Sequence, residues 1–365
     1  MLDKGQLQLD LKADEGGLIY AEEKRKGRKE LCLVGTVFRN VCENQAALDM
    51  VDETIRESVD AQRDIRMDDA GHLSLNGFTA GSRNAPKFHW AKNIIHRNYT
   101  DDDAKKLNYR VSATFALFWN MVKGTAPEDV INDFKQFLLN TGIARMDSSG
   151  QMSYDKNGKG SYTVEIGDGS SSTKPFTFKD VELSPPCGAS AENYARFIHR
   201  EAQPHEFSVS WTTSRFNSAG LPDSQLGGNF FIAQYGIRIQ SAANTMICWR
   251  SREWHGTSLH TVCGVDSRGS PLYHQRGISF VTSNRIPKVW RSYDKGSLSH
   301  ESAAQQIFGL IPDPHGNQDI ADGLKDKLDT QVISEHTRRS KRKKTLMRKA
   351  QESEMALYKS WMSRI

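Results

Sequence analysis

The feature that most constrains this chain is a series of short apolar segments between residues 160 and 290. Glycine, proline and serine separate these segments, and each is short enough to be a single strand. The segments are YTVEI (162–166), FTFKDVEL (176–183), FSVSWTT (207–213), NFFIAQYGIRI (229–239), NTMICW (244–249) and GISFVTS (277–283). Many short strands with turn residues between them are typical of two packed sheets, so the pattern predicts a sandwich or jelly roll.

The residues before this region have helical spacing. The segment 43–59 places apolar residues at 47, 48, 51, 55 and 59, and 109–122 is apolar on nearly all sides, as in a buried helix. The segment 125–142 opens with a proline and two acids and closes with a glycine, which are helix start and stop signals. ELCLVGTVF (30–38) predicts one strand.

These patterns predict an α+β chain in three parts. Residues 1–145 form a mainly helical support region, and residues 146–295 form a double-stranded β-helix, or jelly-roll, core. Residues 296–365 form a polar, basic helical tail. The two larger parts need not be separable domains.

Composition excludes several classes of protein. The 365 residues are 37% hydrophobic and 25% charged, and no apolar run approaches the roughly 20 residues that span a bilayer. The N-terminus lacks the apolar segment of a secretory signal. The five cysteines are scattered without a CxxC pair, which argues against a zinc knuckle or a disulfide framework. We therefore expect an intracellular protein with no membrane partner.

The net charge of +5 is small, but its distribution is uneven. Five basic residues occupy 24–29 and eight of the twelve residues at 338–349 are basic. Such clusters are either solvated surface or arms that bind phosphate, and they also serve as nuclear-localisation signals. The sequence therefore leaves a nucleic-acid partner and a nuclear location open.

A candidate metal site centres on His255, which follows the apolar run TMICW. Upstream, His199 and Glu201 are two residues apart, so in extended backbone they share a face. His255 lies 56 residues after His199 (255 − 199), which leaves room for strands to fold back. Two imidazoles and one carboxylate are the ligand set of non-haem Fe(II) oxygenases, and they leave open positions for a cosubstrate and O₂.

Three further residues complete this candidate site. Arg276 would hold the distal carboxylate of 2-oxoglutarate through two charged hydrogen bonds. Thr257 and Ser258 would shape the pocket or orient a ligand. The alternatives are a core histidine at 255, an ordinary salt bridge at 276, and a helix over 189–201. On a helix, residues two apart point about 200° apart, and the metal pair would be lost.

The segments HREAQPHEFSVSWTTSR, GGNFFIAQYGIRIQSAANTMICWRSREWHGTSLH and RGISFVTS together resemble the core of a 2-oxoglutarate/Fe(II)-dependent oxygenase. They are most similar to fungal proteins related to the TET/JBP base oxygenases, over about residues 180–290. One departure is Glu201, where most members have Asp. The resemblance implies Fe(II) and 2-oxoglutarate as cofactors and a modified base such as 5-methylcytosine as substrate.

Two other functions stay open from the sequence. The chain could be a catalytically inactive jelly roll that binds nucleic acid or acts as a scaffold, or a dioxygenase of a protein side chain or small metabolite. The aromatic residues Phe230, Phe231, Trp249 and Trp254 are expected in the core rather than stacked on a base. Three further histidines lie near the motifs. His205 could support the metal ligands, and His260 and His274 have no assigned role.

Overall fold

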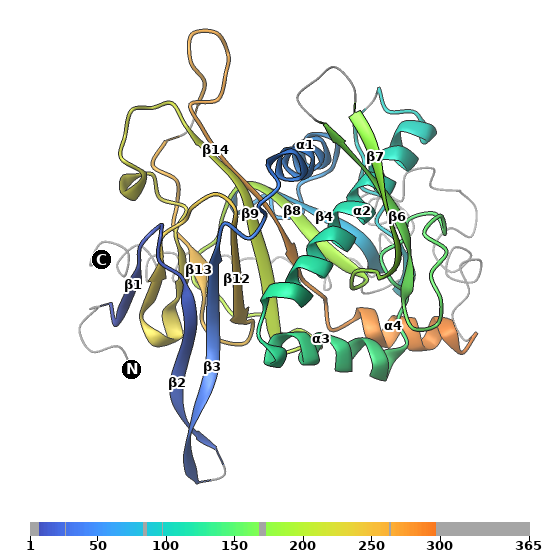
Figure 1. The fold of residues 1–365 in the computed structure, drawn as a ribbon, viewed down its shortest axis with the longest axis horizontal. Helices are drawn as coiled ribbons and strands as arrows, with labels where there is room; N and C mark the ends of the chain where they lie inside the picture. Colours follow the sequence, from blue (N-terminus) through green and yellow to red (C-terminus); the bar gives the residue numbers. More distant parts are fainter. Residues whose placement is uncertain are drawn as a thin grey trace, which may run out of the picture.

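The computed structural model describes residues 7–25, 27–82, 86–96, 98–167, 173–262 and 264–296. The predicted basic tail, with its cluster at 338–349, lies outside the described residues apart from Gly296. The described part is a mixed α/β structure, mostly sheet, with four helices (Figure 1). The helices are α1 (Gln45–Ala61), α2 (Asp101–Thr125), α3 (Glu128–Thr141) and α4 (Ile286–Asp294).

The largest sheet has eight strands and runs through the middle of the molecule (Figure 1). In spatial order they are β2 (Gly17–Arg25), β3 (Arg28–Arg39), β12 (Thr245–Arg250), β9 (Phe207–Asn217), β14 (Tyr273–Phe280), β8 (Cys187–Ala195), β4 (Ala70–Gly81) and β5 (Pro86–Trp90). Neighbouring strands in this sheet are antiparallel.

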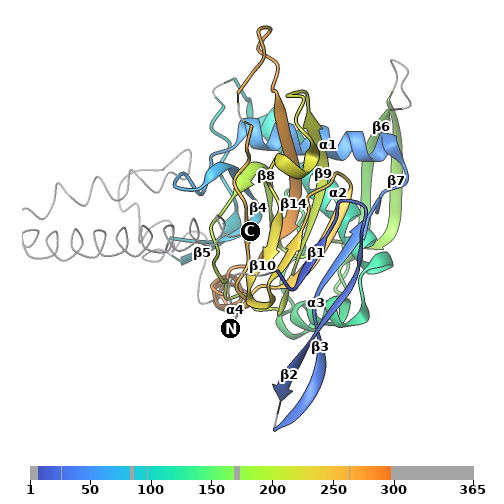
Figure 2. The same ribbon diagram turned by 90° about the vertical axis from the view of Figure 1, so that its left-hand side faces the viewer.

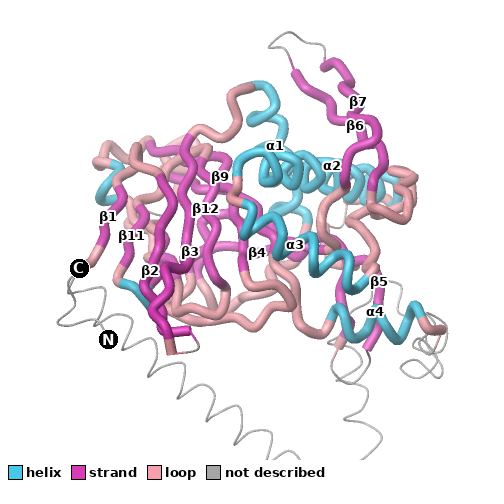
Figure 3. The backbone as a smooth tube through the Cα atoms, turned by 60° about the horizontal axis from the view of Figure 1, so that its bottom comes forward, coloured by secondary structure: helices cyan, strands magenta, loops and turns pink. Residues whose placement is uncertain are grey.

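Two smaller sheets accompany it. A four-stranded sheet has the order β1 (Leu9–Leu11), β11 (Ile237–Ile239), β10 (Phe230–Ile232) and β13 (Gly256–Thr257). It lies at one side of the molecule (Figure 3). The third sheet is a two-stranded ribbon of β6 (Lys159–Gly167) and β7 (Thr173–Glu182), which packs beside α2.

The two faces of the large sheet bury different clusters. Toward α1, α2 and α3, alternate residues of β9, β12 and β14 join a helix-packed core, in which Phe118 stacks on Phe280 with ring centroids 4.7 Å apart. Toward the small sheet, Ile247 and Trp249 of β12 pack with Ile232 of β10. Side chains alternate along a strand, so the helices cover one face and the four-stranded sheet lies against the other.

The chain passes repeatedly between these two sheets. After β8 in the large sheet, the segment around His199 pairs with His255 at the start of β13. The chain then returns to the large sheet as β9, forms β10 and β11 in the small sheet, returns as β12, forms β13, and ends in the large sheet as β14. Apart from β10 and β11, which pair with each other, strands adjacent in sequence from β9 to β14 therefore lie in different sheets.

Several expectations are confirmed at the level of elements. The helix expected over 43–59 is α1, whose first turn is capped by the Asn44 side chain accepting from the Ala47 amide at 3.0 Å. The helix over 125–142 is α3, which begins after Pro127 and ends at Gly142 in the left-handed conformation (φ 55°). Each of the six apolar segments contains a strand.

The first 145 residues differ from the expectation of a mainly helical region because they also supply β1 to β5. The sequence indicated only part of β3. Strands β2 and β3 form a hairpin that projects beyond the body of the molecule (Figure 2). The outer end of this hairpin is exposed at residues 28–31, and its charged residues hide the alternation that marks a strand.

No helix among the described residues is long and apolar enough to cross a membrane. The cysteines at 32, 42, 187 and 248 are all free.

Candidate functional site

His199 and His255 lie side by side on neighbouring extended segments. The His199 amide donates to the His255 carbonyl at 2.7 Å, and the His255 amide donates to the His199 carbonyl at 2.9 Å. The two imidazole rings have centroids 4.4 Å apart. The alternative of a helix over 189–201 is therefore wrong, since this segment is strand β8 followed by extended backbone.

Each imidazole is fixed by a backbone carbonyl. Nδ1 of His199 lies 2.8 Å from the Phe197 carbonyl, and Nδ1 of His255 lies 2.7 Å from the Glu253 carbonyl. A carbonyl only accepts, so Nδ1 carries the proton in both rings and Nε2 is the atom with a free lone pair. This is the arrangement that orients imidazole ligands in metal sites.

Burial keeps both imidazoles neutral. It lowers the pKa of His199 to about 2, with His255 and Arg196 adding to the shift, and it also lowers the pKa of His255. His255 is only 3% exposed. A neutral imidazole is the form that binds a metal, so the local environment favours the ligand form at neutral pH.

Glu201 lies on the same side as the two rings. Its Oε1 is 3.7 Å from Nε2 of His199, and its amide donates to the Ser251 carbonyl at 2.8 Å. Its carboxylate also pairs with Arg196 at 3.2 Å and accepts from Gln203 at 3.4 Å. As the described side chains stand, no three His, Cys, Asp or Glu groups are arranged to hold a metal ion. Glu201 would have to exchange Arg196 for the ion.

Thr257 and Ser258 fix the strand that carries His255. The Thr257 amide donates to the Arg196 carbonyl at 2.9 Å, and Thr257 is the cross-strand partner of Phe230. The buried Ser258 exchanges two hydrogen bonds with the Asn229 backbone, one through its amide and one through Oγ, both at 2.9 Å. These contacts set the position of β13 against β10.

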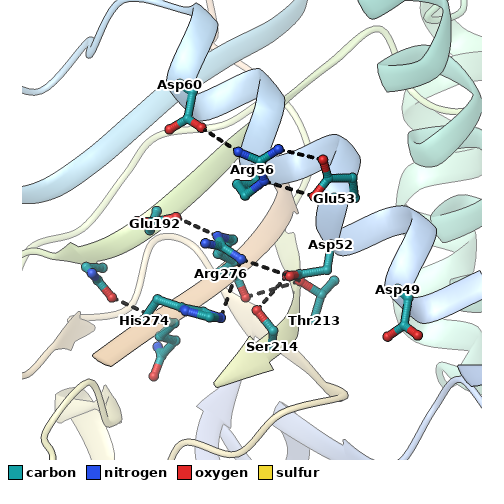
Figure 4. A network of polar contacts seen from close by, with 12 residues as sticks. Asp49, Asp52, Glu53, Arg56, Asp60, Glu192, Thr213, Ser214, His274 and Arg276 are labelled. Atoms are coloured by element: carbon teal, nitrogen blue, oxygen red, sulfur yellow. Dashed lines mark hydrogen bonds and ion pairs between the residues drawn. The ribbon is translucent and has the colours of Figure 1, made fainter. Parts of the chain in front are cut away.

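Arg276 does not lie with the two histidines. Its side chain points toward α1 and donates to Asp52 of that helix at 3.0 Å and to Glu192 of β8 at 2.5 Å (Figure 4). The same Asp52 carboxylate accepts from the hydroxyls of Thr213 and Ser214. Arg276 is 8% exposed and has two carboxylate partners. Its guanidinium joins a helix to the sheet on the face away from the small sheet.

A second arginine, Arg215, was not indicated by the sequence analysis. It lies on β9 as the cross-strand partner of Gln275, one position from the Ser214–Arg276 pair. Its guanidinium donates to Tyr273 Oη at 2.7 Å and also to Gln275 Oε1. The only signal for it was its place at the end of the strand FSVSWTT, and a strand pattern does not tell which face an arginine at its end occupies.

The other aromatic and histidine residues lie in different parts of the structure. Phe230 and Trp249 pack on His255, with ring centroids at 6.0 and 5.5 Å, and Phe231 is buried. Trp254 is 40% exposed and lies beneath the Arg200 guanidinium at 5.1 Å. The expectation that this ring lies in the core is therefore wrong. His205 lies against Phe134 and Phe137 on the helix side, His260 lies against Tyr273, and His274 is on β14.

The sequence matches no protein-family profile, and no curated protein matches it. Several solved structures are distantly similar. NgTET1 in complex with 5mC DNA has 7% identity and a TM-score of 0.39, covering 70% of this chain and 74% of that one. A Pseudomonas putida prolyl-4-hydroxylase has 8% identity and a TM-score of 0.31, covering 67% and 90%. The Fe(II)/α-ketoglutarate-dependent dioxygenase TqaL has 10% identity and a TM-score of 0.27, covering 67% and 80%.

Proposed function

We propose that this chain is an Fe(II)- and 2-oxoglutarate-dependent dioxygenase whose metal ligands are His199, Glu201 and His255. The observation that carries the proposal is the pair of neighbouring imidazoles, each locked through Nδ1 and each leaving Nε2 available, with a carboxylate oxygen 3.7 Å from one of them. Two imidazoles and one carboxylate suit ferrous iron and leave coordination positions open.

The strand order supports a double-stranded β-helix as the scaffold. The segments alternate between two facing sheets, with β8, β14, β9 and β12 side by side in one and β13, β10 and β11 side by side in the other. This alternation is what a jelly roll requires. In it, the His199 segment and β13 are neighbours, and the metal ligands gather between the sheets.

When bound, the metal would supply oxidation chemistry with O₂ and 2-oxoglutarate. The chain's own part is to present two neutral imidazoles, to release Glu201 from Arg196 toward the metal, and to surround the site with Phe230 and Trp249. These rings exclude bulk water from the imidazoles. Thr257 and Ser258 keep β13 in register, so that His255 stays beside His199.

For the substrate, we propose a nucleic-acid base, with 5-methylcytosine as the candidate that the family resemblance suggests. Lys24, Arg28 and Lys29 of the basic cluster lie near the tip of the projecting β2–β3 hairpin, where Lys24 and Lys29 are cross-strand partners (Figure 1). A basic ribbon of this kind fits a phosphate backbone. A base in duplex DNA would have to be flipped out to reach the metal. With DNA as the proposed substrate, we also propose a nuclear location.

The test is metal binding by the purified chain, measured by anaerobic Fe(II) titration with 2-oxoglutarate and the visible absorption band of the complex. We expect one equivalent to bind to wild type. His199→Ala and His255→Ala should each lose more than the roughly 10–100-fold in affinity that removal of an outer hydrogen-bond partner costs. His96→Ala, which changes an exposed histidine elsewhere, is the matched control and should bind normally.

A well-folded wild type that binds no metal would favour the second candidate function, a nucleic-acid-binding or scaffold protein without chemistry. The observation on that side is the Arg196–Glu201 ion pair, which occupies the carboxylate. Affinity for a methylated oligonucleotide, measured at two salt concentrations, distinguishes these two nucleic-acid functions from an enzyme that acts on small metabolites. Affinity for nucleic acid falls steeply with salt because bound phosphates release counterions.

A further inference from the structure

Arg215 lies on the inner face of the large sheet, opposite to Arg276. Gln275, its cross-strand partner, donates to the Gly228 carbonyl at 3.4 Å and accepts from the Ser241 hydroxyl at 2.8 Å. Gly228 and Ser241 flank β10 and β11 of the small sheet. Since cross-strand partners point to the same side, the Arg215 side chain also faces the small sheet.

The hydrogen bonds of Arg215 go only to neutral groups, and the Asp223 carboxylate acts on its charge without a direct contact. Besides Tyr273 and Gln275, it donates to the backbone carbonyls of Gly227 at 3.0 Å and Asp223 at 3.3 Å. Its Nε is buried without a hydrogen-bond partner. In the part of the chain that the structure describes, no carboxylate forms an ion pair with it, whereas Arg276 has two. A cation held in this way favours an anion as its missing partner.

Two residues beside Arg215, His260 and Gly228, belong to the same polar cluster. Nε2 of His260 is also buried without a partner. At Gly228 an added Cβ would lie 2.7 Å from His260 Nε2 and 2.8 Å from Gln275 Oε1. At this left-handed position (φ 67°) a side chain would clash with both groups, so a glycine is needed for His260 and Gln275 to pack together here.

The same inter-sheet space reaches the two histidines. Gly228 is two residues before Phe230, about 7 Å along an extended chain, and the Phe230 ring is 6.0 Å from the His255 ring. The inner face of β9 and β14 carries small residues that stay partly accessible to solvent: Ser210, Thr212, Gly277 and Ser279. These four side chains are small, so this part of the inner face carries little side-chain volume.

We infer that Arg215, together with Tyr273 and Gln275, is the anchor for the far carboxylate of the acidic cosubstrate, and that Arg276 is not. This inference rests on the proposed function. The guanidinium would turn its free Nε–H, and one N–H now given to a neutral acceptor, toward the carboxylate. Arg276 keeps a separate task, which is to hold α1 against the sheet through Asp52.

The experiment compares Arg215→Gln with Arg276→Gln. Each is loaded with Mn(II) as a redox-silent metal, and 2-oxoglutarate affinity is measured by calorimetry, with melting temperature recorded without ligand. We expect Arg215→Gln to weaken 2-oxoglutarate binding about 10–100-fold while Mn(II) affinity is retained. Arg276→Gln should melt at a lower temperature and bind 2-oxoglutarate within about threefold of wild type, because it removes an ion pair outside the inter-sheet space. The reverse pattern would overturn the inference.

Arg215→Lys covers the case in which the glutamine variant does not fold. It keeps the charge but loses the two-pronged geometry, and we expect an intermediate loss of 2-oxoglutarate affinity. Wild-type affinity in a folded lysine variant would contradict the inference.

The outcome for metal is read separately. If wild type binds no Mn(II), the proposed function fails, and the anchor is tested with metal-free 2-oxoglutarate, succinate and inorganic phosphate by thermal shift. A carboxylate-induced shift that Arg215→Gln abolishes supports the anion site alone. A shift with phosphate only, or with none of the three, overturns it.

Discussion

The two faces of the large sheet differ in what their side chains do. On β14, Phe280 is fully buried among the aromatic rings of α2 and α3, whereas the preceding Ser279 points between the sheets and stays partly accessible. On β9, Trp211 and Ser210 show the same contrast. On β9 and β14 the helix-covered face therefore carries large buried side chains, and the inner face carries small ones.

The two arginines repeat this contrast in charge. Arg276 on the helix side is satisfied by Asp52 and Glu192, and it stabilises the docking of α1. Arg215 on the inner side has only neutral acceptors. A buried cation that has its counter-charges stabilises the fold, whereas a buried cation without them favours an anionic ligand.

The largest expected effect comes from truncating two consecutive residues of β14 that face opposite sides of the large sheet. Phe280→Ala should lower the free energy of unfolding by about 3–5 kcal/mol, because it opens a cavity in the aromatic cluster with Phe118 and Phe134. Ser279→Ala should change it by less than about 0.5 kcal/mol. Urea denaturation measures both. Similar losses for the two variants would mean that both faces are packed alike.

A second test uses acid, because the helix side also buries His205. Burial lowers the pKa of His205 to about 4, and its ring packs on Phe134 with centroids 4.3 Å apart. Below pH 6.5 the unfolded chain binds a proton at this histidine, whereas the folded chain binds it only near pH 4. The free energy of unfolding should therefore fall as pH drops through this window, by up to about 3 kcal/mol from this residue.

His205→Gln removes that contribution and should flatten the pH dependence between pH 6.5 and 4 in urea titrations. Some slope should remain, since burial also lowers the pKa of His260 to about 4 and lowers the pKa values of His199 and His255. An unchanged slope in the variant would show that His205 is not what makes this face sensitive to acid.

The smallest expected effect on stability is on the inner face. Ser210→Leu adds an apolar side chain between Ser279 and Ile247, its cross-strand partners. We expect the free energy of unfolding to change by no more than about 1 kcal/mol, while the stabilisation by 2-oxoglutarate with Mn(II) is reduced. If the inner face were already filled, overpacking would cost about 1–3 kcal/mol instead. Thermal melts with and without ligand distinguish the two cases.

Much of the core was predictable because local signals were strong. The helix α3 has its proline and glycine boundaries in the sequence, and strands such as β12 are continuous apolar runs. The strands β1, β2, β4, β5 and β8 were missed, and β3 was predicted only in part. Their residues are polar, small or solvated on one side, and their pairing comes from distant neighbours, so propensity carries little information about them.

The sequence by itself determined the element types with strong periodicity and the residue types of a candidate metal site. Only the tertiary structure decided which of those residues meet. It brought His199 beside His255 through a pairing across 56 residues, and it turned Arg276 away because side chains alternate along β14. The physical reason is that strand register decides which face a residue occupies, and register is set by long-range pairing rather than by neighbours in the chain.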